Sequence, residues 1–220
     1  MRRFFQFAVL VVLVAVGFGC GGGARVRHAE PGNMAVFQGQ SVDKIYFMPF
    51  NTDNVTGEGD IGSPEDQAEH KARWFIHLAG AAQMHLAKKW PGVKVIYVGA
   101  PDKDYLAKIC EKHETTVEVT DVAPASGFTL SGAYISENIV SGTSRALLGA
   151  MQGASSNIVH WKLARGGDVI YNARSQGQYM GGGFSWGYEG YGVNDQLGIQ
   201  LADVLTALHD GEPVLVTGEE

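Results

Sequence analysis

Cysteine is scarce in this chain: two occur among 220 residues, at positions 20 and 110. Cys20 follows directly on an apolar run, which leaves Cys110 alone in the rest of the chain. A single thiol there excludes an intrachain disulfide framework. Cys110 lies in the stretch YLAKICEKH, on the apolar side of a predicted helix, so we expect a buried and unreactive thiol.

A strong charge of either sign is also absent. The chain holds 17 Lys and Arg against 23 Asp and Glu, a net charge of −6. It contains no basic run, so a nucleic-acid partner is not predicted. An apolar content of 45% and a charged content of 18% are typical of a globular protein.

Long apolar runs are missing beyond the first twenty residues. The chain opens with the cationic head MRR, and the apolar stretch FFQFAVLVVLVAVGFG follows. This order is typical of a secretory signal peptide. The apolar stretch has roughly 16 residues, whereas a membrane-spanning helix needs about 20.

Cys20 stands where the signal peptide of a lipoprotein would be cleaved. A small residue, Gly19, precedes it, although the two residues before Gly19 depart from the commonest pattern. We therefore predict that residues 1–19 are removed and that acyl chains on Cys20 anchor the protein to a membrane. Gly21, rather than Asp, resembles the default for delivery to the periplasmic face of the outer membrane in Gram-negative bacteria. Two alternatives stay open, an uncleaved anchor and an ordinary secretory signal, and both still export the protein.

The segment after this cysteine has no clear periodicity. Residues 20–41 are rich in Gly and polar residues, so we predict a flexible tether. Residues 42–220 are then expected to form a single globular domain.

Within that domain, hydrophobic periodicity and turn residues predict the secondary structure. Helices are expected at 63–90, 102–113 and 194–213. Strands are expected at 43–50, 93–98, 115–119 and 127–140, with a hairpin at 155–180 that turns at Gly166 and Gly167. Apart from the short stretch 115–119, the elements follow the order β-α-β-α-β-β-β-α. One mixed sheet with helices packed on it accounts for this order, which is an α/β (α+β) fold.

Three stretches resemble bacterial envelope lipoproteins. KIYFMPF resembles the opening strand of the domain shared by the TolB amino-terminal region, the curli-secretion lipoprotein and penicillin-binding-protein activator lipoproteins. TLSGAYIS is similar to a later strand of that domain. SGTSRALLGAMQGASSNIVHWKLARGGDVIYNARSQG is similar to an uncharacterised lipoprotein family. The resemblance spans most of residues 43–210 and implies a docking or assembly module rather than a catalyst.

Motifs that carry catalysis are missing. The chain has no Gly-x-Ser-x-Gly elbow, phosphate-binding loop or dinucleotide fingerprint, so we predict neither an enzyme nor a cofactor. His70, His77 and His85 share the first predicted helix, but steps of seven and eight residues separate them by roughly 10 Å or more. One metal ion is not easily shared at that spacing. We therefore predict no metal site and place these histidines on a solvated helix surface.

The most function-like feature is the glycine-rich segment MGGGFSWGYEGYGVND at 180–195. Its aromatic residues are Phe184, Trp186, Tyr188 and Tyr191. Aromatic side chains anchor interfaces and membrane surfaces, so a partner-binding loop is one interpretation. The other is a long connection whose aromatic residues fold back over an open sheet edge.

A last candidate is Arg145, which either binds an acidic group or ties its own loop to a neighbouring carboxylate or carbonyl. Together these features predict a non-catalytic interaction module of the cell envelope. Its expected partners are the membrane, through Cys20, and an envelope protein or a second copy of the chain. The alternative is a periplasmic protein that binds a small ligand or a metal.

Overall fold

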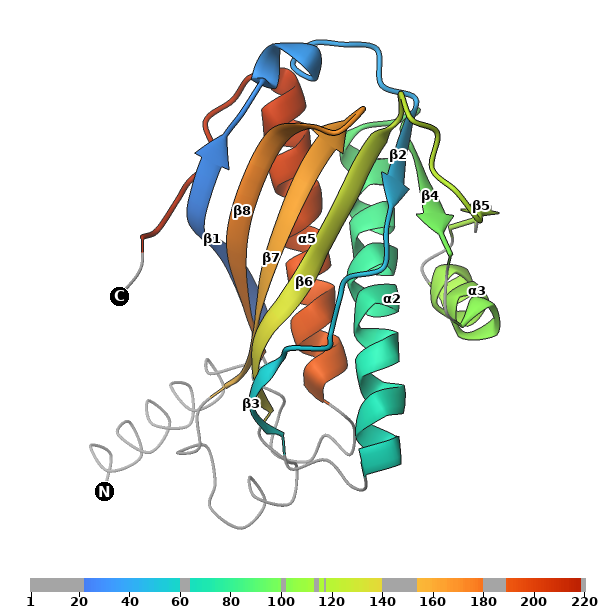
Figure 1. The fold of residues 1–220 in the computed structure, drawn as a ribbon, viewed down its shortest axis with the longest axis vertical. Helices are drawn as coiled ribbons and strands as arrows, with labels where there is room; N and C mark the ends of the chain where they lie inside the picture. The colour runs from blue at the N-terminus through green and yellow to red at the C-terminus, as the bar shows by residue number, and fades with distance from the viewer. Residues whose placement is uncertain are drawn as a thin grey trace, which may run out of the picture.

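The predicted order of elements is confirmed, and two strands that the sequence did not predict are added to it. The computed structural model describes residues 22–59, 64–99, 102–112, 115–116, 118–139, 154–179 and 189–218 (Figure 1). The strands are β1 (Gly22–Pro31), β2 (Lys44–Phe47), β3 (Thr56–Gly59), β4 (Lys94–Val98), β5 (Glu118–Thr120), β6 (Phe128–Ile139), β7 (Ser155–Arg165) and β8 (Asp168–Tyr179). The helices are η1 (Met34–Val36), α2 (Pro64–Lys89), α3 (Lys103–Lys112) and α5 (Glu189–Asp210).

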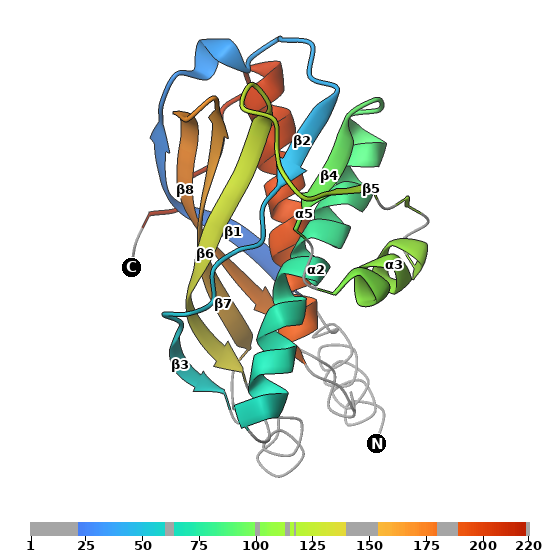
Figure 2. The same cartoon turned by 45° about the vertical axis from the view of Figure 1, so that its right-hand side comes forward.

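Among the described residues, the strands form one mixed sheet in the order β1-β8-β7-β6-β2-β4-β5 (Figure 2). In this order, β1, β8, β7 and β6 each run antiparallel to the next strand. From β6 onward, through β2 and β4 to β5, neighbouring strands run parallel. β3 pairs with the far end of β6, on the same edge as β2. The sheet therefore has an antiparallel half and a parallel half that meet at β6.

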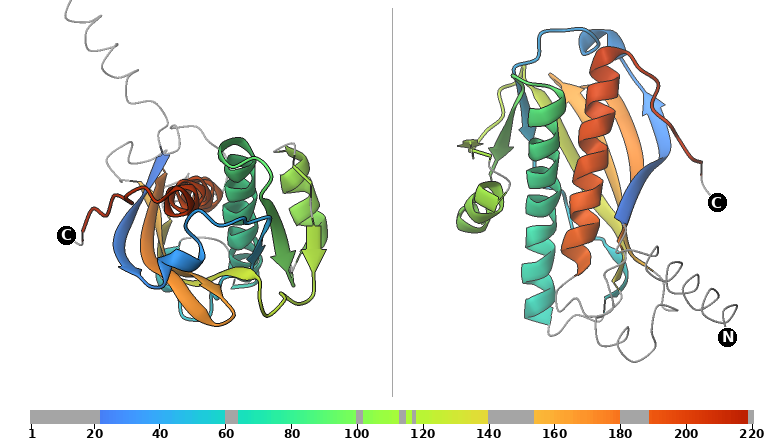
Figure 3. Two further views of the ribbon diagram at one scale, coloured as in Figure 1. Left: turned by 90° about the horizontal axis from the view of Figure 1, so that it is seen from above. Right: turned by 180° about the vertical axis from the view of Figure 1, so that it is seen from behind.

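The described helices α2, α3 and α5 lie on one face of this sheet (Figure 3). α5 packs on β1, β7 and β8, α2 lies beside α5, and α3 packs on α2. The result is a two-layer α/β arrangement. The opposite face of the antiparallel half is not covered by any described helix.

α2 is buried on several sides in its middle, because it contacts the sheet, α5 and α3. The 3.6-residue period of the sequence predicts a single apolar stripe on this helix, formed by Ala68, Ala72, Phe75, Leu78, Ala79, Ala82 and Leu86. Trp74 and Ile76 lie off that stripe, yet both are fully buried. Ala72, which does lie on that stripe, is exposed. A helix that is apolar around its whole circumference is typical of a buried position.

α5 and α2 approach closely at Gly198. A Cβ atom at this position would lie 2.1 Å from the carbonyl oxygen of Leu78 and 2.9 Å from Ala81 Cβ. No side chain fits at such distances without moving one helix, so this contact requires glycine.

β1 overturns the prediction of a flexible tether at 20–41. Gly22–Pro31 pairs with β8 along its length, and Val26 is buried under α5. The ladder shifts between Val26 and His28, so one extra residue interrupts the alternation of inward and outward side chains. This bulge hides the period of two that would have identified a strand.

The hairpin between β7 and β8 is confirmed. Gly166 and Gly167 form its turn with φ of 58° and 93°, as a two-residue turn of type I′ requires. The sequence pattern predicts Val169, Tyr171 and Ala173 on one face of the returning strand, but the ladder shifts beside Ala164 and Val169 leaves that face. Ile170 is buried in its place, and Val169 is 40% exposed.

The predicted buried thiol is also confirmed. Cys110 is 1% exposed, with its sulfur 3.8 Å from the hydroxyl of Tyr97. Burial is the main reason why the pKa of Tyr97 lies well above its usual value, and the neighbouring Cys110 raises this pKa further. Both groups therefore lie in the core between β4 and α3.

Candidate functional site

Most predicted site residues lie outside the described part of the chain. These are Cys20, Arg145, Phe184, Trp186 and Tyr188. Tyr191 is described, and it does not belong to a connecting loop as the sequence suggested. α5 begins at Glu189, so Tyr191 lies in the first turn of that helix.

Tyr191 is engaged within the protein. Its hydroxyl lies 2.8 Å from His70 Nδ1, and its ring stacks on His77 with 4.3 Å between centroids and 6° between planes. One face of the ring is therefore covered by α2. Tyr191, the last aromatic residue of the segment 180–195, therefore joins the start of α5 to α2.

His77 corrects a second expectation, that the histidines of α2 are solvated. It is 5% exposed and has partners on both ring nitrogens. Nδ1 lies 3.0 Å from Asp195 Oδ1, and Nε2 lies 2.9 Å from the hydroxyl of Tyr105. A neutral imidazole satisfies both contacts if Nδ1–H donates to Asp195 and Nε2 accepts from Tyr105. This chain of hydrogen bonds links α5, α2 and α3.

Arg73 packs against the outer side of this cluster. Its guanidinium lies 4.4 Å from the centre of the Tyr105 ring, within the range of a cation–π contact. It forms an ion pair with Glu69 and lies 4.0 Å from Asp102. Asp102 in turn accepts the backbone N–H of Tyr105 at 2.9 Å, as a helix cap. Arg73 thus connects the cap of α3 to α2.

The electrostatics of the cluster keep its phenols protonated. Burial, with a further contribution from Tyr191, raises the pKa of Tyr105 to about 12. Burial also raises the pKa of Tyr191, against an opposing hydrogen bond from Arg73. An activated nucleophile needs a shift in the other direction. The arrangement is suited to holding three helices together.

The sequence does contain a signal for this cluster. In WFIHLAGAA, at 74–82, His77 is the one polar residue of an otherwise apolar run. Such a run indicates a helix that is buried all round, where a histidine needs internal partners. The prediction of a single apolar stripe obscured that signal.

A second polar cluster lies at the end of the sheet where β6 stops and β7 starts. Glu137 and Asn157 stand opposite each other in the β6–β7 ladder. Asn157 Nδ2 donates to Asn194 Oδ1 at 3.4 Å, and the Tyr134 hydroxyl donates to the same oxygen at 2.8 Å. Lys71 Nζ approaches Glu137 Oε1 at 3.9 Å, beyond hydrogen-bond distance.

Two buried oxygen atoms of this cluster have no hydrogen-bond partner: Glu137 Oε2 and Asn157 Oδ1. Both atoms are acceptors when Glu137 is ionised, so neither can satisfy the other. Burial raises the pKa of Glu137, against an opposing contribution from Lys71. A proton on Glu137 supplies a donor between two side chains that face each other across the ladder.

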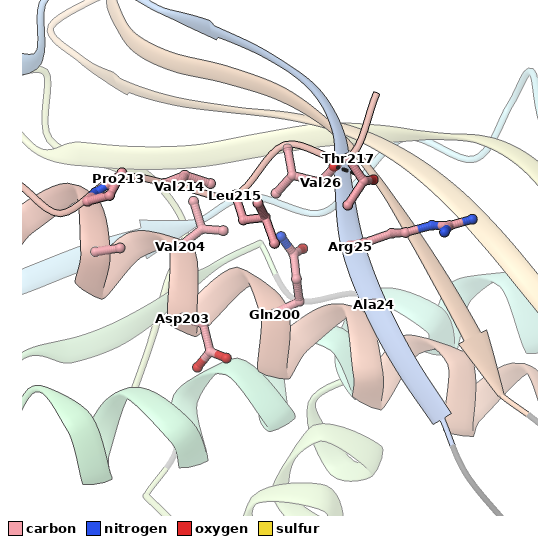
Figure 4. A pocket seen from close by; sticks show the side chains of 11 residues that line it. Ala24, Arg25, Val26, Gln200, Asp203, Val204, Pro213, Val214, Leu215 and Thr217 are labelled. Carbon is pink, nitrogen blue, oxygen red and sulfur yellow. Dashed lines mark hydrogen bonds between the residues drawn. The ribbon is translucent and has the colours of Figure 1, made fainter. Parts of the chain in front are cut away.

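A shallow groove of about 280 Å³ lies between β1, α5 and the C-terminal segment (Figure 4). Its lining is mostly apolar and includes Val26, Val204 and Leu215. Gln200 reaches into it from α5, and its buried Oε1 has no hydrogen-bond partner. The groove could admit a small apolar group with one hydrogen-bond donor.

Within the described residues, no group of three His, Cys, Asp or Glu side chains is close enough to hold a metal ion. No helix within the same ranges has the length and hydropathy needed to cross a membrane.

No known protein family and no curated protein matches this chain in sequence. Among solved structures, it is similar to the PelC dodecamer from Paraburkholderia phytofirmans in space group P6, at 16% identity and a TM-score of 0.40. A single-residue variant of that dodecamer, in space group C2, gives 16% identity and a TM-score of 0.38. In both cases the match covers 86% of this chain and 98% of the other. A likeness at this level carries no argument about function.

The His77 cluster predicts a specific loss of stability. In His77→Phe the ring stack on Tyr191 is kept, but Asp195 and Tyr105 lose their shared partner. We expect the free energy of unfolding to fall by about 2 kcal/mol, the net value of two hydrogen bonds. Urea denaturation measures the loss.

The control is His85→Phe on the same helix, a half-buried residue without a hydrogen-bond partner among the described residues. We expect a change within about 0.5 kcal/mol. Equal losses in the two variants would show that His77 contributes through packing alone.

The raised pKa of the buried Glu137 leads us to expect that the free energy of unfolding depends on pH. Because the folded protein holds this proton more tightly than the unfolded chain, the contribution is complete below the ordinary pKa of about 4.3. It is lost as the pH rises through the raised pKa of Glu137. Glu137→Gln keeps a donor at every pH, so we expect a shallower decline in unfolding free energy as the pH rises above about 4.3.

Glu118→Gln is the matched control, because Glu118 is an exposed carboxylate paired with Lys94 at 2.8 Å. It is expected to leave the decline attributed to Glu137 in place. Parallel pH profiles for wild type and Glu137→Gln would contradict a proton on Glu137.

Proposed function

We propose that this chain is an exported lipoprotein, anchored through Cys20 at the periplasmic face of the outer membrane. There it acts as a non-catalytic interaction and assembly module of the cell envelope. The observation that carries the proposal is the leader that ends in Cys20, together with the strand that begins at Gly22. The resemblance of the sequence to envelope lipoproteins supports the same function.

The position of β1 changes how such an anchor would work. Gly22 is closely packed, since a Cβ there would lie 2.8 Å from Gln196 and 2.9 Å from Tyr179. Two extended residues span at most about 7 Å. If Cys20 is acylated, the lipid would therefore hold one end of the sheet close to the membrane, with no long tether between them.

The glycine-rich segment predicted to bind a partner, residues 180–195, starts from the same end of the sheet. Gly22, Tyr179 and Ser155 are in register across β1, β8 and β7. The chain leaves β8 at Tyr179 and enters α5 at Glu189. The segment that contains Phe184, Trp186 and Tyr188 is thus connected to the end of the sheet nearest Cys20. This connection supports a role for these residues at the membrane or with a partner beside it.

Support for a non-catalytic role comes from how the polar residues are used. The hydroxyl of Tyr105 and both ring nitrogens of His77 are engaged in bonds between helices. The groove beside β1 has about 280 Å³, slightly below the range of about 300–1,000 Å³ for small-molecule sites. This groove by itself therefore gives little support to the alternative of a small-ligand protein.

Acylation of Cys20 is tested on the mature protein. Intact-mass spectrometry is expected to show a chain that starts at Cys20 and carries acyl groups. Cys20→Ser is expected to move the protein out of the outer-membrane fraction, whereas Cys110→Ser leaves it there. An intact leader, or an unmodified terminus beyond Cys20, would overturn the anchor.

The interaction segment is tested by crosslinking in cell envelopes. The triple variant Phe184→Ala, Trp186→Ala, Tyr188→Ala is expected to lose at least one crosslinked partner, because aromatic side chains dominate interface energy. The matched control removes three exposed apolar side chains elsewhere, with Val122→Ala, Val169→Ala and Leu215→Ala. Retention of every partner by the aromatic variant would reject the segment as the binding site.

A further inference from the structure

The face of the antiparallel half-sheet that no described helix covers carries a cluster of cations. On β7 and β8 the inward residues are buried, and the residues between them alternate outward. Arg174 and Lys162 point outward on these strands, and Arg25 does so on β1. In Figure 1 β7 and β8 pass in front of α5, so this face is the side away from the helices.

The register arranges the three cations on a diagonal. Arg25 stands opposite Gln176, two residues from Arg174 on β8. Lys162 stands opposite Asn172, two residues on the other side of Arg174. Diagonal neighbours of this kind have Cα atoms about 7–8 Å apart. His28 and His160 flank Arg174 directly on the two adjacent strands.

The one carboxylate in these rows, among the described residues, is Glu30, and it is already engaged. Its two oxygens lie 3.2 Å from His28 Nε2 and 3.1 Å from Asn172 Nδ2. The hydrogen bond with His28, followed by that with Asn172, lowers the pKa of Glu30. Glu30 is therefore held by His28 and Asn172 and does not pair with Arg25 or Lys162.

This basic sheet face contrasts with the chain as a whole, which carries a net charge of −6. Charge asymmetry of this kind steers a partner of opposite sign toward one face. The neighbouring strand β6 presents small side chains opposite the same rows, with Ser131 beside Lys162 and Ala133 beside His160. A partner can therefore approach the cations without a steric barrier from β6.

We propose that this basic sheet face is the surface by which the module of the proposed function binds an acidic segment of a partner protein. The position argues against the membrane as the ligand. At about 3.3 Å per residue, Arg25 lies about 10 Å from Gly22 along β1, and the level of Lys162, seven residues from Ser155 along β7, lies about 23 Å away. Those distances reach or exceed the Debye length of about 8–10 Å, so a membrane at Gly22 attracts these cations weakly.

The side chains also argue against an anionic polysaccharide. Sugar rings stack on aromatic side chains, and among the described residues these rows present His28 and His160 but no Trp, Tyr or Phe. Arg, Lys and Gln side chains are instead suited to carboxylates and backbone carbonyls of a polypeptide.

The experiment measures binding of labelled poly-L-glutamate to the full mature protein in detergent, at low and at physiological salt. The first variant is Arg25→Gln, Lys162→Gln, Arg174→Gln, and the second is the charge reversal Arg25→Glu, Lys162→Glu. We expect the first to weaken binding at least tenfold and the second to abolish it. The second variant leaves Arg174 and its internal contacts in place, and thermal unfolding verifies that both variants are folded.

The matched control removes three exposed cations elsewhere, with Lys44→Gln, Lys103→Gln and Lys108→Gln. It changes the net charge equally and is expected to keep affinity within twofold. Loss of binding in the control as large as in the first variant would overturn the proposal, as would absence of wild-type binding.

Two further probes distinguish the class of partner. Tighter binding of polygalacturonate, or of phosphatidylglycerol vesicles, with the same dependence on Arg25 and Lys162 would overturn the assignment to a polypeptide. The measurement does not depend on acylation, so failure of the Cys20 anchor and failure of this surface give separate results.

Discussion

The close contact of α5 with α2 at Gly198 is the constraint on which the rest of the fold depends. α5 covers the antiparallel half of the sheet and α2 lies beside it toward the parallel half, so this contact joins the two halves. Because the Leu78 carbonyl would meet any Cβ at 2.1 Å, the helices approach at the level of their backbones. That approach brings His77 within reach of Asp195 and places Tyr191 against its ring.

The same contact explains why polar groups are buried near the start of α5. Asn194, one helical turn before Gly198, reaches Tyr134 and Asn157 on the sheet. Buried polar groups specify one arrangement only when their hydrogen bonds are satisfied. In this region Glu137 Oε2 and Asn157 Oδ1 are both satisfied when Glu137 carries a proton. The stability of this end of the sheet is therefore coupled to pH through the Glu137 carboxyl.

The sequence predicted most of the fold because its elements have clear local signals. Helices 63–90 and 102–113 have caps or a stop at Pro91, and the hairpin has the glycine pair that its turn requires. β1 was missed because a bulge beside Val26 breaks its alternation, and pairing with β8 is a long-range contact. The His77 cluster was missed because its partners, Tyr105 and Asp195, come from two other helices, and spacing along one helix carries no information about them.

The edge of the sheet suggests how a partner would have to bind. β1 is an edge strand of the described sheet, and the unpaired backbone groups of an edge strand can pair with another chain. Here the bulge interrupts the edge, and Thr217 donates its backbone N–H to the Val26 carbonyl at 2.9 Å, which places the C-terminal segment alongside. Strand addition at β1 would have to displace that segment. Contacts with the basic sheet face need no such displacement, because Arg25, Arg174 and Lys162 already point away from the helices. If Cys20 anchors the end of the sheet at Gly22, this face stands beside the membrane and remains open to a protein approaching from the side.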